Sequence, residues 1–370
     1  MLLLKIQKDS LVKPLNNLIN IVERRHSLPI LMNILLSFNK GSLKLTTSDI
    51  EIEISSTINI DQQLNEQDIT VSARKFLDIL KNMNSDDLVE LSLQKNKLFI
   101  FQKNSKYSLQ ILPAEDFPLI NLPPIPKDTI SARQDNLKKL INSISFSMAY
   151  QDVRYYLNGL FIKFDTEYII AVATDGHRLA INSEEINQTE KSIQLEFIVP
   201  RKAVIEIEKM CNETEENINL YFYAQHLKIE VGSFQLITKL IDGKYPDYTK
   251  VIPQKTQTYI NINRQEFLTG LQRVSILTAD KYRGIKLHVK GNKILLQSTN
   301  AEQEEAEEQI SCSDNQLDIK MGFNVTYLID VLSNLKSETV QLLLSDPQSS
   351  ALVLDSNHQN FKYVVMPMRI

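Results

Sequence analysis

An acidic, an imidazole and a guanidinium side chain follow closely on an apolar run of the sequence. They belong to VATDGHRLA, residues 172–180, where Asp175 precedes Gly176, His177 and Arg178. Asp175 and His177 could act as a general acid and base or as two metal ligands. Arg178 could hold an anionic substrate. These residue types therefore raise the question of a catalytic loop.

The companion residues that catalysis would need do not accompany this stretch. A catalytic pair requires a nucleophile, a third partner or a metal site in the same region. None of the five histidines stands in an HxH, HExxH or Cys/His spacing, and the nine glycines form no GxGxxG or GxxxxGK[ST] loop. Cys211 and Cys312 stand alone and form no CxxC site. We therefore expect no catalytic residue, no metal and no cofactor, and we interpret residues 174–176 as the tight turn of a β-hairpin, with Gly176 at a positive φ.

The elements that position this turn belong to a pattern that occurs three times along the chain. Two helix-like segments with apolar residues at helical spacing are followed each time by alternating strand-like residues. The period is near 127 residues, which predicts three copies of one unit. The landmarks are first-helix starts at Asp9, Asp135 and Gln265, second-helix starts at Val71, Val199 and Phe323, and last-strand starts at Tyr107, Phe234 and Phe361.

The predicted fold class is α+β, with three repeated domains of two helices packed on antiparallel sheets. Proline-rich connectors, LPPIPKDTI and VIPQKTQ, separate the repeats, so we place the domains at residues 1–126, 127–254 and 255–370. The helical segments are expected at residues 9–25, 72–83, 135–148, 200–210, 264–278 and 324–335.

The net charge of −4 argues against nucleic-acid binding only if the charge is evenly spread. The six helical segments carry 13 basic and 8 acidic side chains, a net charge of +5, which leaves −9 for the rest of the chain. Five of the six lean basic, whereas acid collects in ETEE (213–216) and EQEEAEE (302–308). This segregation fits either solvated helix faces or a surface that faces phosphates.

The size of the repeats limits how they could enclose DNA. A unit of about 125 residues has a diameter of about 35 Å. Three such units in a closed triangle leave a hole of about 5 Å, whereas six leave one of about 35 Å, which admits a duplex. Two chains, joined head to tail with repeat 1 of one against repeat 3 of the other, would therefore be needed to encircle DNA.

Seven stretches between residues 151 and 370 closely resemble the bacterial DNA polymerase III β subunit family, the sliding clamps, and the resemblance covers the whole chain, in order, with threefold repeats of the right length. They are QDVRYYLNG (151–159), VATDGHRLA (172–180), VPRK (199–202), LIDGKYPDY (240–248), EQEEAEE (302–308), GFNVTYLIDVL (322–332) and YVVMPMRI (363–370). The resemblance implies the DNA clamp fold and a homodimeric ring of six domains around duplex DNA. It also implies a non-catalytic subunit of the polymerase III holoenzyme that tethers the replicative polymerase and clamp-loader subunits through linear motifs.

The resemblance further implies a groove between the second and third domains where partner peptides dock. It maps onto Leu157, Thr174, Gly176, His177, Arg178, Leu179, Pro246, Lys250, Val251, Asn324, Tyr327, Val364, Val365, Met366, Pro367, Met368 and Arg369. His177 and Arg178 would offer polar edges, and Met366 and Met368 would adapt to varied ligands, although methionine is as often plain core filler. Lys250 departs from the arginine common in the family, and lysine cannot form the same forked contact with a carboxylate. Ile370 stands where leucine is more usual.

DNA contacts and ring closure are implied in the same way. The DNA contacts of the family map onto Arg25, Arg74, Gln151, Tyr155, Tyr156 and Arg201. Ring closure maps onto Tyr107 and Leu109 against Ile276 and Leu277, with Lys103 and Lys106 facing the acids of residues 302–308.

Two other classes of function remain as alternatives. An enzyme that uses Asp175 and His177 would lose its activity on His177→Ala. A repeat scaffold that binds only proteins would not need basic helix faces. No apolar run approaches the ~18 residues of a membrane span, and the N-terminal apolar stretch is too short for a signal peptide, which with two lone cysteines predicts a cytoplasmic protein.

Overall fold

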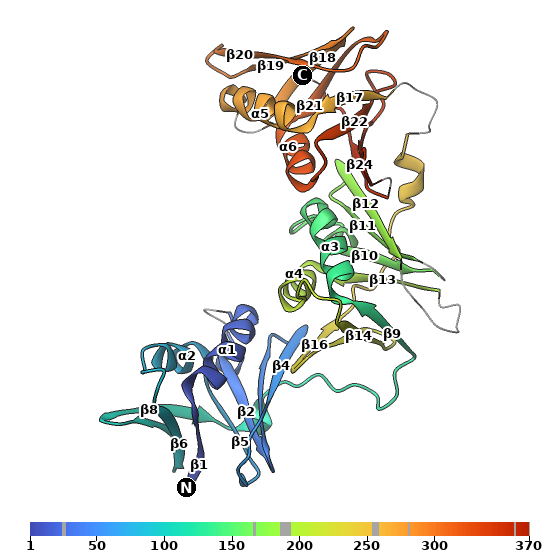
Figure 1. Cartoon of the computed structure of the whole chain (residues 1–370). Coiled ribbons are helices and arrows are strands. Elements are labelled where there is room, and N and C mark those ends of the chain that lie inside the picture. Colours follow the sequence, from blue (N-terminus) through green and yellow to red (C-terminus); the bar gives the residue numbers. More distant parts are fainter. Residues whose placement is uncertain are drawn as a thin grey trace. The chain divides into compact units, whose positions relative to one another are not determined.

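The computed structural model describes residues 1–23, 27–165, 168–185, 194–253, 259–279, 282–358 and 360–369. The chain divides into two compact units, a first unit of Met1–Asp135 with Ile205–Leu240 and a second unit of Asn136–Val204 with Ile241–Ile370. Both units combine helices with antiparallel strands (Figure 1), so the predicted α+β class is confirmed. No helix in these ranges is long and apolar enough to cross a membrane.

Six α-helices lie in the described part of the chain, two for each predicted repeat. The first helix of each repeat ends in a short 3-10 turn, at Ile19–Ile21, Ser145–Ser147 and Ser275–Leu277. The predicted segments were right in type but too long at these ends, because apolar spacing continues through the 3-10 turn while the α-helical hydrogen bonds do not. The helices are α1 Lys8–Leu18, α2 Ala73–Lys81, α3 Gln134–Ile144, α4 Arg201–Met210, α5 Arg264–Val274 and α6 Val325–Asn334.

A cationic side chain at the start of the first helix fastens it to the second helix in two of the repeats. Lys8 Nζ donates to the carbonyl oxygen of Met83 at 2.6 Å, just beyond α2. Arg264 Nη1 donates to the carbonyl oxygen of Leu332 at 3.1 Å, in the last turn of α6. Carbonyls in the last turn of a helix lack intrahelical partners, so the contact with Leu332 satisfies a group that α6 leaves open.

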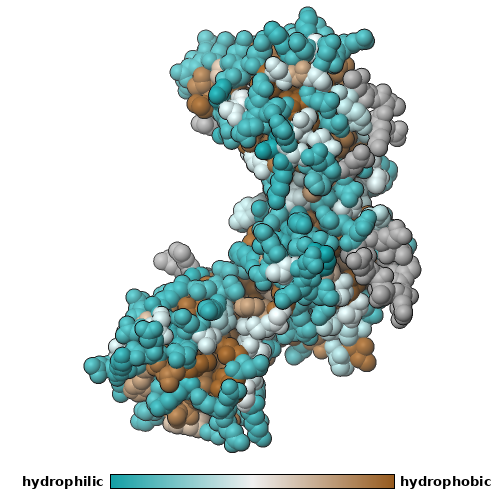
Figure 2. Space-filling view, in the orientation of Figure 1, coloured by the Kyte–Doolittle hydropathy of each residue, from teal (hydrophilic) through white to brown (hydrophobic). Residues whose placement is uncertain are grey.

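The first unit contains one twelve-stranded antiparallel sheet. Its order is β1 (Leu2–Gln7), β6 (Leu88–Gln94), β7 (Lys97–Gln102), β8 (Ser105–Leu112), β5 (Gln67–Ser72), β2 (Asn33–Asn39), β3 (Ser42–Ser48), β4 (Ile52–Asn59), β16 (Phe234–Lys239), β15 (His226–Val231), β14 (Asn217–Phe222) and β9 (Asp128–Arg133). Figure 2 shows a mostly hydrophilic face, with hydrophobic residues gathered among the strands of this unit.

The second unit contains an eight-stranded and a four-stranded antiparallel sheet. The first has the order β13 (Leu195–Pro200), β10 (Gly159–Phe164), β11 (Tyr168–Thr174), β12 (Arg178–Glu185), β24 (Lys362–Val365), β23 (Ala351–Asp355), β22 (Thr339–Leu343) and β17 (Ile260–Asn263). The second has the order β20 (Glu305–Ser311), β19 (Lys293–Thr299), β18 (Gly284–Lys290) and β21 (Asp318–Asn324).

Two strand pairings carry the sheets from one predicted repeat into the next. In the first unit, β4 pairs with β16 from Ser56↔Phe234 to Ile52↔Thr238. In the second unit, β12 pairs with β24 from Arg178↔Val365 to Ile181↔Lys362. The two pairings involve equivalent strands, one repeat apart. The second brings the turn of residues 174–176 beside the C-terminal residues of the chain.

Candidate functional site

The stretch VATDGHRLA forms the predicted hairpin turn between β11 and β12. Gly176 has a φ of +88°, a left-handed conformation that glycine adopts without strain. The Asp175 carboxylate accepts the backbone N–H groups of His177 at 2.9 Å and Arg178 at 3.0 Å. These contacts are those of an Asx turn, so the acidic side chain builds the turn itself.

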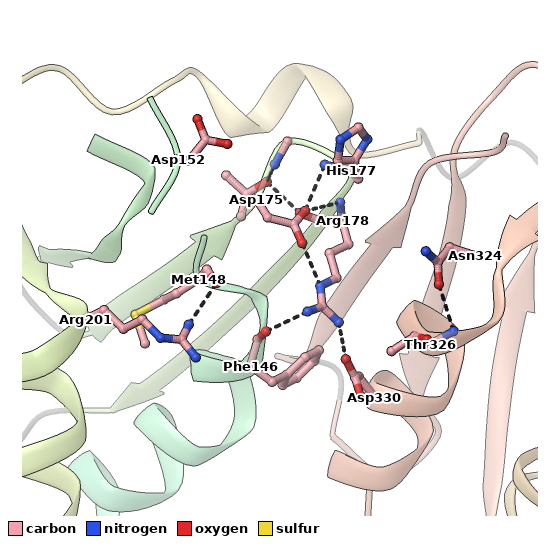
Figure 3. A network of polar contacts seen from close by, with 12 residues as sticks. Phe146, Met148, Asp152, Asp175, His177, Arg178, Arg201, Asn324, Thr326 and Asp330 are labelled. Carbon is pink, nitrogen blue, oxygen red and sulfur yellow. Dashed lines mark hydrogen bonds and ion pairs between the residues drawn. The ribbon is translucent and has the colours of Figure 1, made fainter. Parts of the chain in front are cut away.

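Arg178 ties this turn to two other elements of the second unit (Figure 3). Its Nε donates to Asp175 at 3.1 Å, its Nη1 to the Asp330 carboxylate on α6, and its Nη2 to the Phe146 carbonyl at 2.8 Å. Its guanidinium also lies 5.3 Å from the ring centre of Phe146 and 4.6 Å from that of Tyr327. All three nitrogens have partners and the side chain is only 11% exposed, so Arg178 holds these elements together.

A cavity of about 180 Å³ lies beside this turn. Sites for whole drug-sized ligands typically measure about 300–1,000 Å³, so this cavity has the size of one or two side chains. It takes its walls from both the second and the third predicted repeats. The lining residues are Arg154, Tyr156, Leu157, Thr174, Gly176, Arg178, Leu179, Pro246, Asp247, Tyr248, Val251, Val364 and Met366.

Arg154 forms one rim of the cavity and is fixed by two acceptors. Its Nε and Nη2 bind the two oxygens of Asp152 at 3.0 and 2.8 Å, and Nη2 also donates to the Asp175 carbonyl at 3.0 Å. The hydrogen bond from the Arg154 side chain lowers the pKa of Asp152 to about 2. A Cβ on Gly176 would lie 2.6 Å from Arg154 Nη1, so the missing side chain is what admits the guanidinium.

A second part of the lining is the segment that holds Pro246, Asp247 and Tyr248. The Asp247 carboxylate accepts the Thr249 hydroxyl at 2.6 Å and pairs with Lys250 at 3.2 Å. The Thr249 contact, followed by Lys250, lowers the pKa of Asp247. Lys250 is 79% exposed and lies outside the lining, so it touches the cavity only through its ion pair with Asp247.

The C-terminal residues Val364 and Met366 supply a third part of the lining. Val364 and Val365 are both buried, but Val364 lines the cavity and Val365 does not, because neighbouring side chains of a strand point to opposite faces. The Met366 N–H donates to the His177 carbonyl at 2.9 Å, and its side chain is 37% exposed at the mouth. The Met368 N–H donates to the Gly322 carbonyl at 2.9 Å and, like Pro367 and Arg369, Met368 lies outside the lining. Ile370 lies outside the described residues.

The remaining predicted groove residues stand near the lining rather than in it. The exposed His177 ring lies parallel to that of Tyr327, with centroids 6.4 Å apart. Burial raises the pKa of Tyr327. Asn324 caps α6, since its side chain accepts the Thr326 N–H at 2.9 Å (Figure 3).

Sequence reasoning missed three lining residues, Arg154, Asp247 and Tyr248, and assigned a fourth, Tyr156, to DNA. All four belong to the motifs QDVRYYLNG and LIDGKYPDY, from which only Leu157 and Pro246 were taken for the groove. Their position beside those two residues was the available signal.

The predicted DNA contacts share a local geometry at two equivalent positions. Arg74 Nη2 donates to the Val22 carbonyl at 2.6 Å, and Arg201 Nη1 donates to the Met148 carbonyl at 2.9 Å. Both carbonyls belong to the residue that ends the 3-10 turn of a first helix. Gln151 has a φ of +55° and, like Tyr155, is exposed, whereas Arg25 lies outside the described residues.

The predicted ring-closing residues differ in exposure. Ile276 is 77% exposed and Tyr107 is 39% exposed, while Leu277 is half-buried. Leu109 is buried in the core of the first unit, opposite Leu98. The Lys106 ammonium lies 4.9 Å from the ring centre of Phe99.

Comparisons with known proteins assign the family. Models of the N-terminal, central and C-terminal domains of the DNA polymerase III β subunit match residues 2–123, 131–247 and 249–369. The β sliding clamp of Pseudomonas putida is 39% identical over 365 residues, and that of Escherichia coli is 37% identical over 366, each across 99% of both chains. The chain belongs to the bacterial sliding clamps.

Solved sliding-clamp structures agree with this assignment. A Pseudomonas aeruginosa sliding clamp is 37% identical, with a TM-score of 0.96 over 100% of both chains. A Caulobacter crescentus β subunit is 31% identical, with a TM-score of 0.92 over 100% of both chains. The clamp fold and the role of DNA polymerase processivity factor, both implied by the sequence resemblance, are confirmed. Among the described residues, no group of three or more His, Cys, Asp or Glu side chains could hold a metal ion.

Proposed function

We propose that two copies of this sliding clamp close head to tail into a ring around duplex DNA. The ring tethers the replicative polymerase and the clamp loader through linear peptides held in the cavity beside Arg178. The protein acts without catalysis of its own, in the cytoplasm. Domains at residues 1–126, 127–254 and 255–370 are part of this proposal, and the junction at 254–255 lies outside the described residues.

The observation that carries the peptide role is the character of the cavity. Its acidic and basic rim groups, Arg154, Arg178 and Asp247, are each bound to partners of opposite charge in the chain itself. A ligand therefore meets an apolar floor of Leu157, Leu179 and Val364. Such a site favours an apolar side chain such as Leu or Phe and discriminates against a charge.

Two related clamps with bound ligands support a ligand site on this protein. One is a P. aeruginosa clamp bound to griselimycin, 38% identical and with a TM-score of 0.95. The other is a C. crescentus clamp with polyethylene glycol bound to its putative β-motif tethering region, 32% identical and with a TM-score of 0.93.

Two strand edges support the ring. β20 is the edge strand of the four-stranded sheet, and β8 pairs with β5 only at Leu112 and Ile111. Exposed edges without partners invite pairing with another chain. Lys106 lies on β8, and Lys103, which pairs with Asp87 at 2.8 Å, lies in the turn before β8. Glu305 and Glu307 lie on β20, so the two edges carry side chains of opposite charge.

The peptide site is tested at Met366, whose side chain lies at the mouth of the cavity. Met366→Ala should lower the affinity for a short synthetic peptide ending in Leu-Phe at least tenfold, because the ligand loses an adaptable apolar contact. Fluorescence polarisation measures this affinity. Tenfold corresponds to ~1.4 kcal/mol.

Met368→Ala is the matched control, because Met368 lies two residues further on and outside the lining. It should change the affinity much less, and light scattering should show the same mass for both variants. Unchanged affinity in Met366→Ala would place the peptide elsewhere.

A further inference from the structure

Residues 149–158 form a loop whose two sides differ in chemistry. Arg154, Tyr156 and Leu157 line the cavity. Tyr150, Val153 and Tyr155 lie outside the lining and are 75%, 94% and 57% exposed. One short loop therefore contributes both a wall of the cavity and a solvent-facing apolar surface.

Hydrogen bonds inside the loop make it one body. The Ala149 N–H donates to the Leu157 carbonyl at 3.1 Å and so joins the two ends. The Asn158 side chain accepts the Asp152 N–H at 2.9 Å and donates to the Asp152 carbonyl at 2.8 Å. Loops closed in this way behave as compact units.

The loop is also fastened at both of its sides. On the cavity side, Arg154 reaches the Asp175 carbonyl of the hairpin turn. On the exposed side, the Arg201 guanidinium binds the Met148 carbonyl and lies 6.0 Å from the ring centre of Tyr150. The exposed surface thus combines two tyrosines, a valine and a cation.

We infer that this loop couples the cavity to the exposed surface of Tyr150, Tyr155 and Arg201. A peptide in the cavity fixes the loop and thereby raises the affinity of the exposed surface for duplex DNA. DNA must then raise the affinity of the peptide by the same factor, because coupling between two binding sites is reciprocal. The sign is positive because both ligands bind the one conformation of the loop that its internal hydrogen bonds hold.

The identities of the two ligands rest on the proposed function. The coupling itself rests on the contacts within residues 149–158. We expect a factor of about five, at the low end of typical allosteric coupling.

The first test uses a reporter on the exposed side of the loop. The chain contains no tryptophan, so Val153→Trp introduces a single tryptophan, outside the cavity lining, whose fluorescence can be excited apart from that of the tyrosines. A peptide ending in Leu-Phe should raise its anisotropy, with a midpoint equal to the dissociation constant that calorimetry gives. Tyr168→Trp, at the far end of β11 from the turn, should stay silent.

The second test measures the affinity of the same peptide with and without a short duplex at low salt, where non-specific DNA binding is strongest. The duplex should raise the affinity about fivefold. Asn158→Ala should abolish this gain while the peptide still binds, because Asn158 braces the loop without lining the cavity. The control is Asn315→Ala, which removes a similar brace from the turn after β20, where Asn315 donates to Ser313 and accepts the Leu317 N–H.

The outcomes separate the coupling from the proposed function. If the peptide does not bind the unmodified protein, the proposed function fails and the coupling fails with it. If the peptide binds but the anisotropy change of Val153→Trp and the duplex effect are both absent, only the coupling is wrong. A duplex that lowers the affinity of the peptide would also overturn it. The reporter experiment does not depend on the folding of Asn158→Ala.

Discussion

At the scale of single residues, Gly176 controls how Arg154 reaches the rim of the cavity. Gly176→Ala would place a Cβ 2.6 Å from Arg154 Nη1 at a φ of +88°. We expect backbone strain of about 1–3 kcal/mol and displacement of the guanidinium. The affinity for the Leu-Phe peptide should fall more than tenfold in fluorescence polarisation.

Gly291→Ala separates the strain from the displacement. Gly291 also has a positive φ, +57°, but a Cβ there would meet no heavy atom within 4 Å. This variant should unfold at lower urea and bind the peptide normally. If Gly176→Ala and Gly291→Ala lower the peptide affinity by the same factor, backbone strain rather than the position of Arg154 would cause the loss.

The ion pair of Asp152 with Arg154 predicts how the loop responds to acid. The pKa of Asp152 is lowered from 3.8 to about 2, chiefly by the hydrogen bond from Arg154. A carboxyl group whose pKa is lower in the folded state stabilises that state fully above pH 3.8, and this contribution is lost as the pH falls through about 2. Peptide affinity should therefore not change between neutral pH and about pH 4 through this group.

The carboxyl carbon of Asp152 reports this pKa directly in an NMR titration. Its midpoint should lie near 2 in the unmodified protein and rise toward 3.8 in Arg154→Met. A midpoint that stays near 2 in the variant would show that Arg154 does not cause the shift.

At the scale of elements, the sequence predicted the features that depend on neighbouring residues. Apolar residues at helical spacing located α2 and α6, and the Asp-Gly pair located the turn after β11, because both signals arise from neighbouring residues. The pairing of β12 with β24 was not predicted, since strand periodicity shows which face is buried but not which strand lies alongside. The alternation of side chains along a strand could have excluded Val365 from the cavity. The two hydrogen bonds from Arg154 to Asp152 could not have been predicted, because they depend on the folded loop.

The strand edges predict how two chains join. Charge reversal on β20, Glu305→Lys with Glu307→Lys, should raise the dimer dissociation constant at least tenfold, because it would place like charges opposite Lys106 on β8 and Lys103 in the turn before it. Sedimentation measures this constant. Combining it with Lys103→Glu and Lys106→Glu should restore the dimer.

Restoration is the informative result, because it requires the two edges to meet. Glu216→Lys makes a charge change of the same kind, one reversal in the other acidic cluster, and should leave the dimer intact. Dissociation without rescue by the combined variant would show that β8 and β20 do not face each other.

At the scale of the whole molecule, the ring predicts a mass. One chain has a mass of 42.5 kDa, so a dimer of two such chains should give twice that value by light scattering at micromolar concentration. Ile276→Ala with Leu277→Ala should shift the mass toward one chain, because truncating an aliphatic side chain in a packed interface costs about 2–5 kcal/mol. A monomeric or trimeric unmodified protein would contradict the two-chain ring.

The ring also predicts a mode of DNA retention that differs from ordinary binding. Contacts to phosphates are non-specific and weaken steeply with salt, so short linear duplexes should bind weakly. A closed ring leaves DNA only when an interface opens or when it reaches a free end. After loading by the cognate loader and ATP, retention on circular DNA should therefore survive salt that abolishes binding to short duplexes. One double-strand cut should release the protein without altering any phosphate contact, as gel filtration of the DNA would show.

Charge reversal at Arg74 and Arg201 should slow loading more than it shortens retention on the closed circle. If the protein stays on DNA with both ends open, the basic helices form a conventional binding surface and the ring does not explain the function.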